Sequence, residues 1–141
     1  MDDQERTAEG KTPLSISVIM PVYNGTEFIQ QSLPPLVAMR ERGEVLEVIV
    51  VDDSSSDDTP DVARRLGAEV MPSGGRLGPG AARNVAAGES KGDILWFIDA
   101  DVIVHDDAAK VLLKGFAEPG VVGVFGSYDD KPPAQNFLSQ Y

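Results

Sequence analysis

Short apolar runs alternate with helix-like stretches along this chain, and that alternation limits the folds open to it. The apolar runs predict strands over residues 15–22, 45–51, 68–71, 93–98 and 121–125. The stretches between them predict helices over residues 26–42, 59–66, 81–89 and 106–116. Strands that alternate with helices form βαβ crossovers, and nearly continuous apolar strands are typical of parallel sheets buried on both faces. We therefore expect an α/β domain of the nucleotide-binding type, with a mostly parallel sheet and helices on both faces.

One proline pair conflicts with an otherwise regular helical pattern. Pro34 and Pro35 lie inside the first predicted helix. Each proline removes a backbone donor and crowds the preceding turn. The pair is expected to kink or divide that helix.

Composition limits the partners of the chain. Its 141 residues allow one domain, with a formal net charge of −11 and a pI of about 4.3. An acidic surface disfavours nucleic acid and anionic membranes, although a divalent cation could bring in a nucleotide diphosphate. The chain has no cysteine and one histidine, which leaves little for thiol, zinc or triad chemistry. Residues 1–13 predict a flexible polar tail, and the lack of a signal-like start or an apolar span predicts a cytoplasmic protein.

Polar residues follow three of the predicted strands. The first strand ends in residues 21–24 (PVYN), the second in 52–54 (DDS) and the fourth in 99–101 (DAD). In open α/β sheets, ligands bind at the carboxyl ends of the strands. These residues are therefore expected to meet at one edge and to form a site there.

The fourth strand runs into two aspartates separated by one alanine. In an extended chain, Asp99 and Asp101 point to the same side and Ala100 points away. Two neighbouring carboxylates repel unless a cation lies between or near them, and hard oxygen ligands select Mg²⁺ or Mn²⁺. The alternative is a solvated acidic turn without a metal.

The other edge residues each allow two interpretations. Only one of Asp52 and Asp53 should reach a pocket, because neighbouring strand residues point to opposite faces; the alternative is a capping cluster before the next helix. Tyr23 could stack on a base or simply cover the end of the sheet. Arg83 lies at a glycine-flanked helix start that could take up an anion. The glycine pattern there matches neither a dinucleotide-binding fingerprint nor a phosphate-binding GxxxxGK[ST] loop.

Three segments taken together, SVIMPVYNG, EVIVVDDSSSDDT and GPGAARNVAAGESKGDILWFIDADV, resemble the family 2 glycosyltransferases of the GT-A fold over residues 15–125. The resemblance implies a site for a nucleotide-diphosphate sugar, usually a uridine diphosphate (UDP) sugar. It implies Tyr23 against uracil, Asp53 as the acceptor for the base, Arg83 beside the nucleotide, and Asp99 and Asp101 at a Mg²⁺ or Mn²⁺ ion. The residues it implies for nucleotide binding are Pro21, Val22, Tyr23, Asn24, Asp52, Asp53, Gly80, Arg83, Asp99 and Ala100.

The resemblance also implies an inverting transfer of the sugar to an acceptor, which could be a saccharide, a lipid or a protein. On this interpretation residues 14–126 form the donor-binding domain. Residues 127–141 begin an acceptor-side region that is cut short, and the catalytic base lies beyond Tyr141. Membrane association is expected only through regions outside this chain. Two alternatives stay open: a receiver-type signalling domain that accepts a phosphoryl group, and a nucleotide-binding module without turnover.

Overall fold

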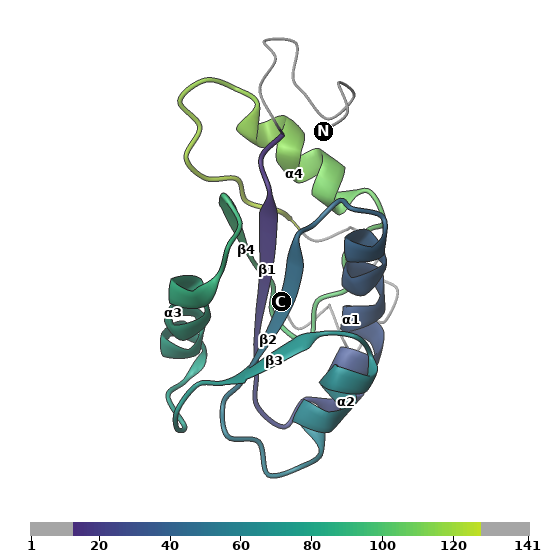
Figure 1. The fold of residues 1–141 in the computed structure, drawn as a ribbon, viewed down its shortest axis with the longest axis vertical. Coiled ribbons are helices and arrows are strands. Elements are labelled where there is room, and N and C mark those ends of the chain that lie inside the picture. Colours follow the sequence, from purple (N-terminus) through teal and green to yellow (C-terminus); the bar gives the residue numbers. More distant parts are fainter. Residues whose placement is uncertain (1–12, 128–141) are drawn as a thin grey trace.

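The computed structural model describes residues 13–127, in which strands and helices alternate strictly (Figure 1). The elements are β1 (Ile16–Val22), α1 (Thr26–Glu41), β2 (Glu47–Asp52), α2 (Thr59–Arg65), β3 (Glu69–Pro72), α3 (Pro79–Glu89), β4 (Ile94–Phe97) and α4 (Ala108–Phe116). Within this part of the chain, no helix combines the length and the apolar character needed to cross a bilayer. The predicted tail at 1–13 and the predicted region at 127–141 fall almost wholly outside the described residues.

The four strands form one parallel sheet in the order β3-β2-β1-β4. β1 is central, and its Val18 pairs with Val48 of β2 and with Trp96 of β4. Every residue of β1 is buried. The predicted parallel sheet is confirmed, and all four strands therefore end at the same edge.

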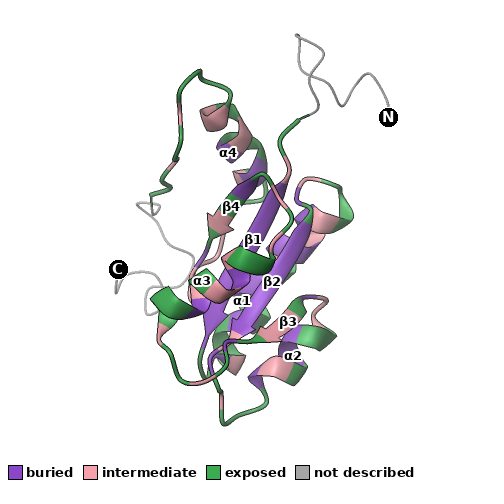
Figure 2. Ribbon diagram, turned by 60° about the vertical axis from the view of Figure 1, so that its left-hand side comes forward, coloured by how far each residue is buried: buried purple, intermediate pink, exposed green. Residues whose placement is uncertain are grey.

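Helices cover both faces of the sheet, as predicted. Alternate residues of a strand point to opposite faces, so Val18 and Met20 of β1 pack in the larger core with Leu33 of α1. Ile19 points the other way, into a smaller core with Ala82 and Ala86 of α3. In Figure 1, α3 lies on one side of the sheet and α1 with α2 on the other. Figure 2 shows β1 and β2 buried between these layers.

α1 is one continuous helix, so Pro34 and Pro35 do not divide it, and the kink predicted as the alternative stays a prediction. The prolines withdraw hydrogen bonds from the carbonyl groups of Gln30 and Gln31, four residues earlier. Both glutamines are exposed, so water can satisfy those carbonyls. The opposite face of the helix, including Leu33, stays buried against the sheet. The packing of that face outweighs the local cost of the two prolines.

The predicted fifth strand over residues 121–125 is not formed. Val122 and Phe125 are 96% and 97% exposed, although Val124 packs against the larger core. An apolar run becomes a strand only when a neighbouring strand satisfies its backbone groups. Among residues 13–127 no strand pairs with this segment.

The close packing of α3 predicts unequal effects for one substitution on its two faces. Ala86 is fully buried against the sheet, whereas Ala81 of the same helix is exposed. We expect Ala86→Leu to lower the free energy of unfolding by about 1–3 kcal/mol, because the added carbons have no space. The matched Ala81→Leu variant should change it by less than about 0.5 kcal/mol. Urea unfolding measures both, and equal effects would show that α3 does not pack as described.

Candidate functional site

The ends of β1 and β2 place Tyr23 beside Asp53. The Asp53 backbone N–H donates to the carbonyl oxygen of Val22 at 2.8 Å, so the pairing of β1 with β2 continues to this point. Val51 of β2 packs against α3, and Asp53 comes two residues after it along the chain. Asp53 therefore points to the α3 side of the sheet, and its neighbour Asp52 points to the other side.

The Asp53 carboxylate is buried, with 4% exposure, and three groups donate hydrogen bonds to it. Its Oδ1 accepts from the Leu77 backbone N–H at 2.8 Å and from the Ser73 hydroxyl at 2.7 Å. Its Oδ2 accepts from the Gly78 backbone N–H at 2.9 Å. These donors, led by the Leu77 N–H and assisted by the positive charge of Arg76, hold the pKa of Asp53 below its usual range despite burial. Asp53 is thus a fixed anion that fastens the β3–α3 loop to the end of β2.

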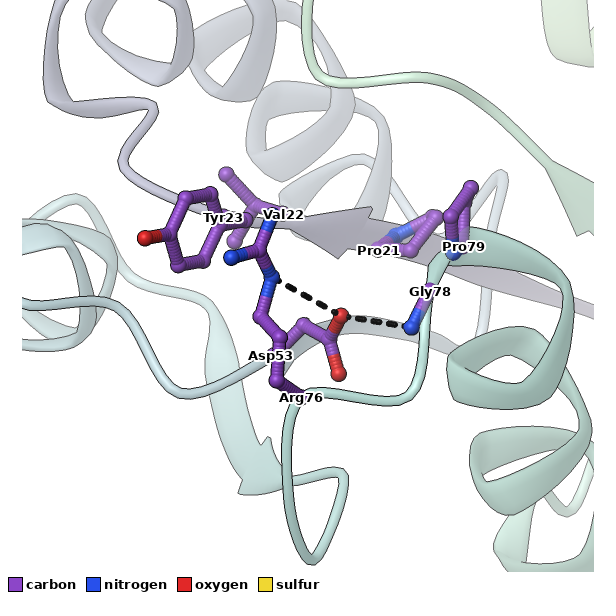
Figure 3. Close-up of a pocket in the computed structure, with 7 residues that line it drawn as sticks. All are labelled: Pro21, Val22, Tyr23, Asp53, Arg76, Gly78 and Pro79. Atoms are coloured by element: carbon purple, nitrogen blue, oxygen red, sulfur yellow. Dashed lines mark hydrogen bonds and ion pairs between the residues drawn. The ribbon is translucent and has the colours of Figure 1, made fainter.

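A pocket of about 220 Å³ opens at this point. Its lining combines the end of β1, the end of β2 and the loop before α3 (Figure 3). The lining residues are Pro21, Val22, Tyr23, Asp53, Arg76, Gly78 and Pro79. Tyr23 is 41% exposed, so its ring lies at the surface of the protein. The pocket therefore offers a flat aromatic surface beside a buried carboxylate.

Arg76 covers part of this pocket. Its guanidinium carbon lies 3.2 Å from the centroid of the Tyr23 ring. Its Nε lies 3.8 Å from Asp53 Oδ2, so the same group forms an ion pair with the carboxylate. Figure 3 shows the Arg76 side chain extending from the β3–α3 loop past Asp53 to Tyr23.

Asp52 and Asn24 hold loops in place. Asp52 Oδ1 accepts from the Ser55 backbone N–H at 3.3 Å. Asn24 adopts a positive φ of 48°, and its Oδ1 accepts from the Ser56 backbone N–H at 2.8 Å. Ser55 in turn accepts from the Asn24 backbone N–H at 2.9 Å. These contacts join the loop after β1 to the loop after β2. A direct nucleotide contact for Asp52 or Asn24 stays a prediction.

Arg83 connects α3 to the end of β4. Its Nη2 donates to Asp99 Oδ1 at 2.6 Å. Its Nε is buried. Among residues 13–127 it is the only buried side-chain nitrogen or oxygen atom without a hydrogen-bond partner. Gly80, one turn earlier in α3, is exposed. The positive charge of Arg83 thus lies beside the first of the two aspartates. A place for Arg83 beside a nucleotide stays a prediction.

The prediction that Asp99 and Asp101 lie in an extended chain, with both carboxylates on one side, is wrong. β4 ends at Phe97, and residues 99–102 form a turn in which the Val102 backbone N–H donates to the Asp99 carbonyl at 3.1 Å. An extended chain, which would turn both carboxylates to one side, is absent there. Ala100 packs against the larger core.

The residues at this edge fit a metal only if a substrate supplies further ligands. Among residues 13–127, no group of three or more Asp, Glu, His or Cys side chains could hold an ion. Asp99 is paired with Arg83, which leaves Asp101 as the other carboxylate that follows β4. Mg²⁺ and Mn²⁺ commonly bind through one or two carboxylates together with phosphate oxygens and water. The donor chemistry therefore suits a cation that arrives with a diphosphate.

The contacts of the β3–α3 loop with the site were not predicted from the sequence. Ser73, Arg76, Leu77 and Gly78 all touch Asp53, and Arg76 also covers Tyr23. This loop follows β3, so it lies at the same edge as the other strand ends. A cation in a loop at that edge was the signal that could have drawn attention to Arg76.

A sequence model of one protein family, described as glycosyl transferase family 2, matches residues 17–140. Glycosyltransferase AglE of Haloferax volcanii is 37% identical over 119 residues, which cover 81% of this chain and 39% of AglE. The chain spans under half the length of the curated relatives that it matches.

Solved structures of glycosyltransferases share the fold. The mannosyltransferase PcManGT of Pyrobaculum calidifontis, in complex with GDP-Man and Mn²⁺, has a TM-score of 0.70 at 29% identity, covering 77% of this chain and 34% of PcManGT. Glucosyl-3-phosphoglycerate synthase of Mycobacterium tuberculosis, in complex with Mn²⁺, UDP and phosphoglyceric acid, has a TM-score of 0.63 at 33% identity, covering 73% and 39%. The α/β fold is thus that of GT-A glycosyltransferases.

The hydrogen bonds of Asp53 predict a pH-dependent loss of stability in Asp53→Asn. Because the folded-state pKa of Asp53 is lowered, the carboxylate stabilises the fold fully above the ordinary aspartate pKa of about 4. That contribution is lost as the pH falls through the lower folded pKa. We expect Asp53→Asn to lower the free energy of unfolding at neutral pH by about 1–3 kcal/mol. The difference from the wild type should shrink in acid, which urea unfolding across pH measures.

The control for this experiment is Glu69→Gln, which neutralises an exposed carboxylate on β3. It should change stability by less than about 0.5 kcal/mol at neutral pH. A difference between Asp53→Asn and the wild type that is constant at all pH values would contradict the role given to the Asp53 charge.

Proposed function

Because this chain belongs to glycosyl transferase family 2, we propose that it binds a nucleotide-sugar donor and forms the donor-binding part of an enzyme that transfers the sugar to an acceptor. The observation that carries this proposal is the pocket between the Tyr23 ring and the buried Asp53 carboxylate at the carboxyl edge of a parallel sheet. Ligands of open α/β sheets bind at that edge.

We propose that the nucleotide bound in this pocket is UDP. The Tyr23 ring in the pocket lining gives a stacking surface for a base. Asp53 Oδ2 accepts one backbone hydrogen bond, from Gly78, and a carboxylate oxygen has room for a second. The N3–H of uracil can fill that position. The M. tuberculosis relative with 33% identity was solved with UDP, which supports the choice.

The diphosphate would lie toward Arg83, Asp99 and Asp101. Arg83 supplies positive charge at the start of α3, where backbone N–H groups also favour anions. Asp101, with Asp99 beside it, would hold a Mg²⁺ or Mn²⁺ ion shared with the diphosphate. A divalent cation bound there supplies Lewis-acid stabilisation of the departing nucleotide diphosphate. Two of the related structures contain Mn²⁺, which supports this assignment.

The remaining parts of the proposal rest on the family resemblance. The transfer inverts the configuration at the sugar carbon, residues 14–126 form the donor-binding domain, and the acceptor is a saccharide, a lipid or a protein. Among residues 13–127 we assign no catalytic base. We place the acceptor site and the base outside this part of the chain. A cytoplasmic location likewise stays a prediction.

The receiver-domain alternative has lost its basis. Receivers carry their acidic pair after the first strand, whereas Asp52 and Asp53 lie at the end of β2 here. The family match and the curated relatives are those of glycosyltransferases. Binding without turnover remains the second reading for this chain, because it needs only the Tyr23–Asp53 pocket.

The donor-site proposal predicts metal-dependent binding of UDP. Isothermal titration calorimetry should detect UDP binding with Mn²⁺ present and at least about tenfold weaker binding in excess chelator, a difference of about 1.4 kcal/mol. Asp101→Asn should produce a similar loss with Mn²⁺ present, because it removes the carboxylate charge that we assign to the cation.

The matched control is Glu89→Gln, which neutralises an exposed carboxylate at the far end of α3 and should leave UDP affinity unchanged. UDP binding that is equally tight with and without metal would contradict the metal assignment alone. If the folded protein does not bind UDP at millimolar concentration, the donor-site proposal as a whole is wrong.

A further inference from the structure

The guanidinium of Arg76 lies where a stacked base would have to lie. Its central carbon is 3.2 Å from the centroid of the Tyr23 ring. Carbon atoms in contact are about 3.5–4.0 Å apart, so no flat ring fits between the two groups. A base stacked between them would need a separation of roughly 7 Å, twice that contact distance. The free protein therefore has its tyrosine platform already covered.

Arg76 also makes the second contact that we assign to the base. Its Nε lies 3.8 Å from Asp53 Oδ2, the oxygen that accepts only one backbone hydrogen bond. A guanidinium is planar, with its N–H groups in the plane. The guanidinium thus lies over Tyr23 and forms an ion pair with Asp53, at the two places that we assign to uracil (Figure 3).

We propose that Arg76 is an internal placeholder for the nucleobase, which a nucleotide must displace before its base can stack on Tyr23. This inference rests on the proposed donor site. Its consequence is that Arg76 sets the affinity of the pocket: the contacts of the guanidinium with Tyr23 and Asp53 are lost on binding and subtract from the affinity of the nucleotide.

The surroundings allow Arg76 to leave without disturbing the site. Its side chain is 59% exposed, so little packing is lost when it moves. Its loop contains Gly74 and Gly78, both at positive φ, and a Cβ at either position would meet no atom within 4 Å. Asp53 keeps its three other donors when the guanidinium departs. The carboxylate is therefore still in place for the incoming base.

The test measures uridine binding to the wild type and to Arg76→Ala. Uridine carries no phosphate, so its binding reports the base site alone. It depends neither on a metal nor on attraction between the Arg76 charge and phosphate groups. We expect Arg76→Ala to bind uridine about three- to tenfold more tightly, the range of an exposed cation–π contact and a weak ion pair together. NMR titration with uridine in the millimolar range gives both affinities.

Arg64→Ala is the matched control, because Arg64 of α2 is also 59% exposed and forms a surface ion pair with Asp61. It removes the same charge and should leave uridine affinity unchanged. A second measurement needs no variant: the Cδ protons of Arg76 should be shifted by the Tyr23 ring current in the free protein. Saturation with uridine should move those signals toward their usual positions.

The outcomes separate this inference from the proposed function. Unchanged or weaker uridine binding in Arg76→Ala overturns the placeholder, as do Arg76 signals that do not respond to uridine. If UDP still binds with Mn²⁺ in that case, the donor site stands. If neither uridine nor UDP with Mn²⁺ binds to the wild type or to the folded variant, both proposals are wrong.

Discussion

The buried carboxylate of Asp53 is the interaction on which the site depends. One side chain at the end of β2 gathers the Ser73 hydroxyl and the Leu77 and Gly78 backbone N–H groups from a loop that begins twenty residues later. Charge-assisted hydrogen bonds of this kind are about twice as strong as neutral ones. They compensate for burying the charge, and they fix the loop that forms one wall of the pocket. Without that anion, the glycine-containing loop would have few contacts to define its position.

The parallel sheet explains why residues far apart in the sequence meet at this edge. β1 pairs with β2 and with β4, so the chain segments that follow these strands all start from one side of the sheet. The chain then returns through a helix each time, and the helices divide between the two faces. The chemistry of the site therefore lies in loops, while the buried strands and helices hold those loops in register.

Much of this arrangement could be predicted from the sequence, because the spacing of the apolar residues and the composition of each segment determine it. The apolar runs predicted four of the strands within two residues, and their carboxyl ends predicted the edge that holds Tyr23 and Asp53. The failures have a common physical cause, which is dependence on neighbours. The run over residues 121–125 has strand composition but no pairing partner among the described residues, and Pro34 and Pro35 are tolerated because of packing on the other side of α1. Asp99 and Asp101 lie in a turn rather than in an extended chain, because β4 ends at Phe97.

The position of Arg76 over Tyr23 is the part of the site that sequence alone could not reveal. That position follows from the path of the β3–α3 loop, which the hydrogen bonds to Asp53 determine. A lone arginine among glycines gives no sign of that path. The contacts of three separate segments have to be known before its role in the pocket can be inferred.

The central claim is that one edge of the sheet binds the nucleotide, and amide NMR tests it most directly. UDP and Mg²⁺ would be added to the ¹⁵N-labelled protein, and the shifted amide signals assigned. The account predicts the largest shifts at Tyr23, Asp53, Leu77 and Gly78, with little change at Ser17 and Gly92, which hydrogen-bond to each other at the opposite edge. Shifts concentrated at that opposite edge, or none near Tyr23 and Asp53 at saturating UDP, would contradict it.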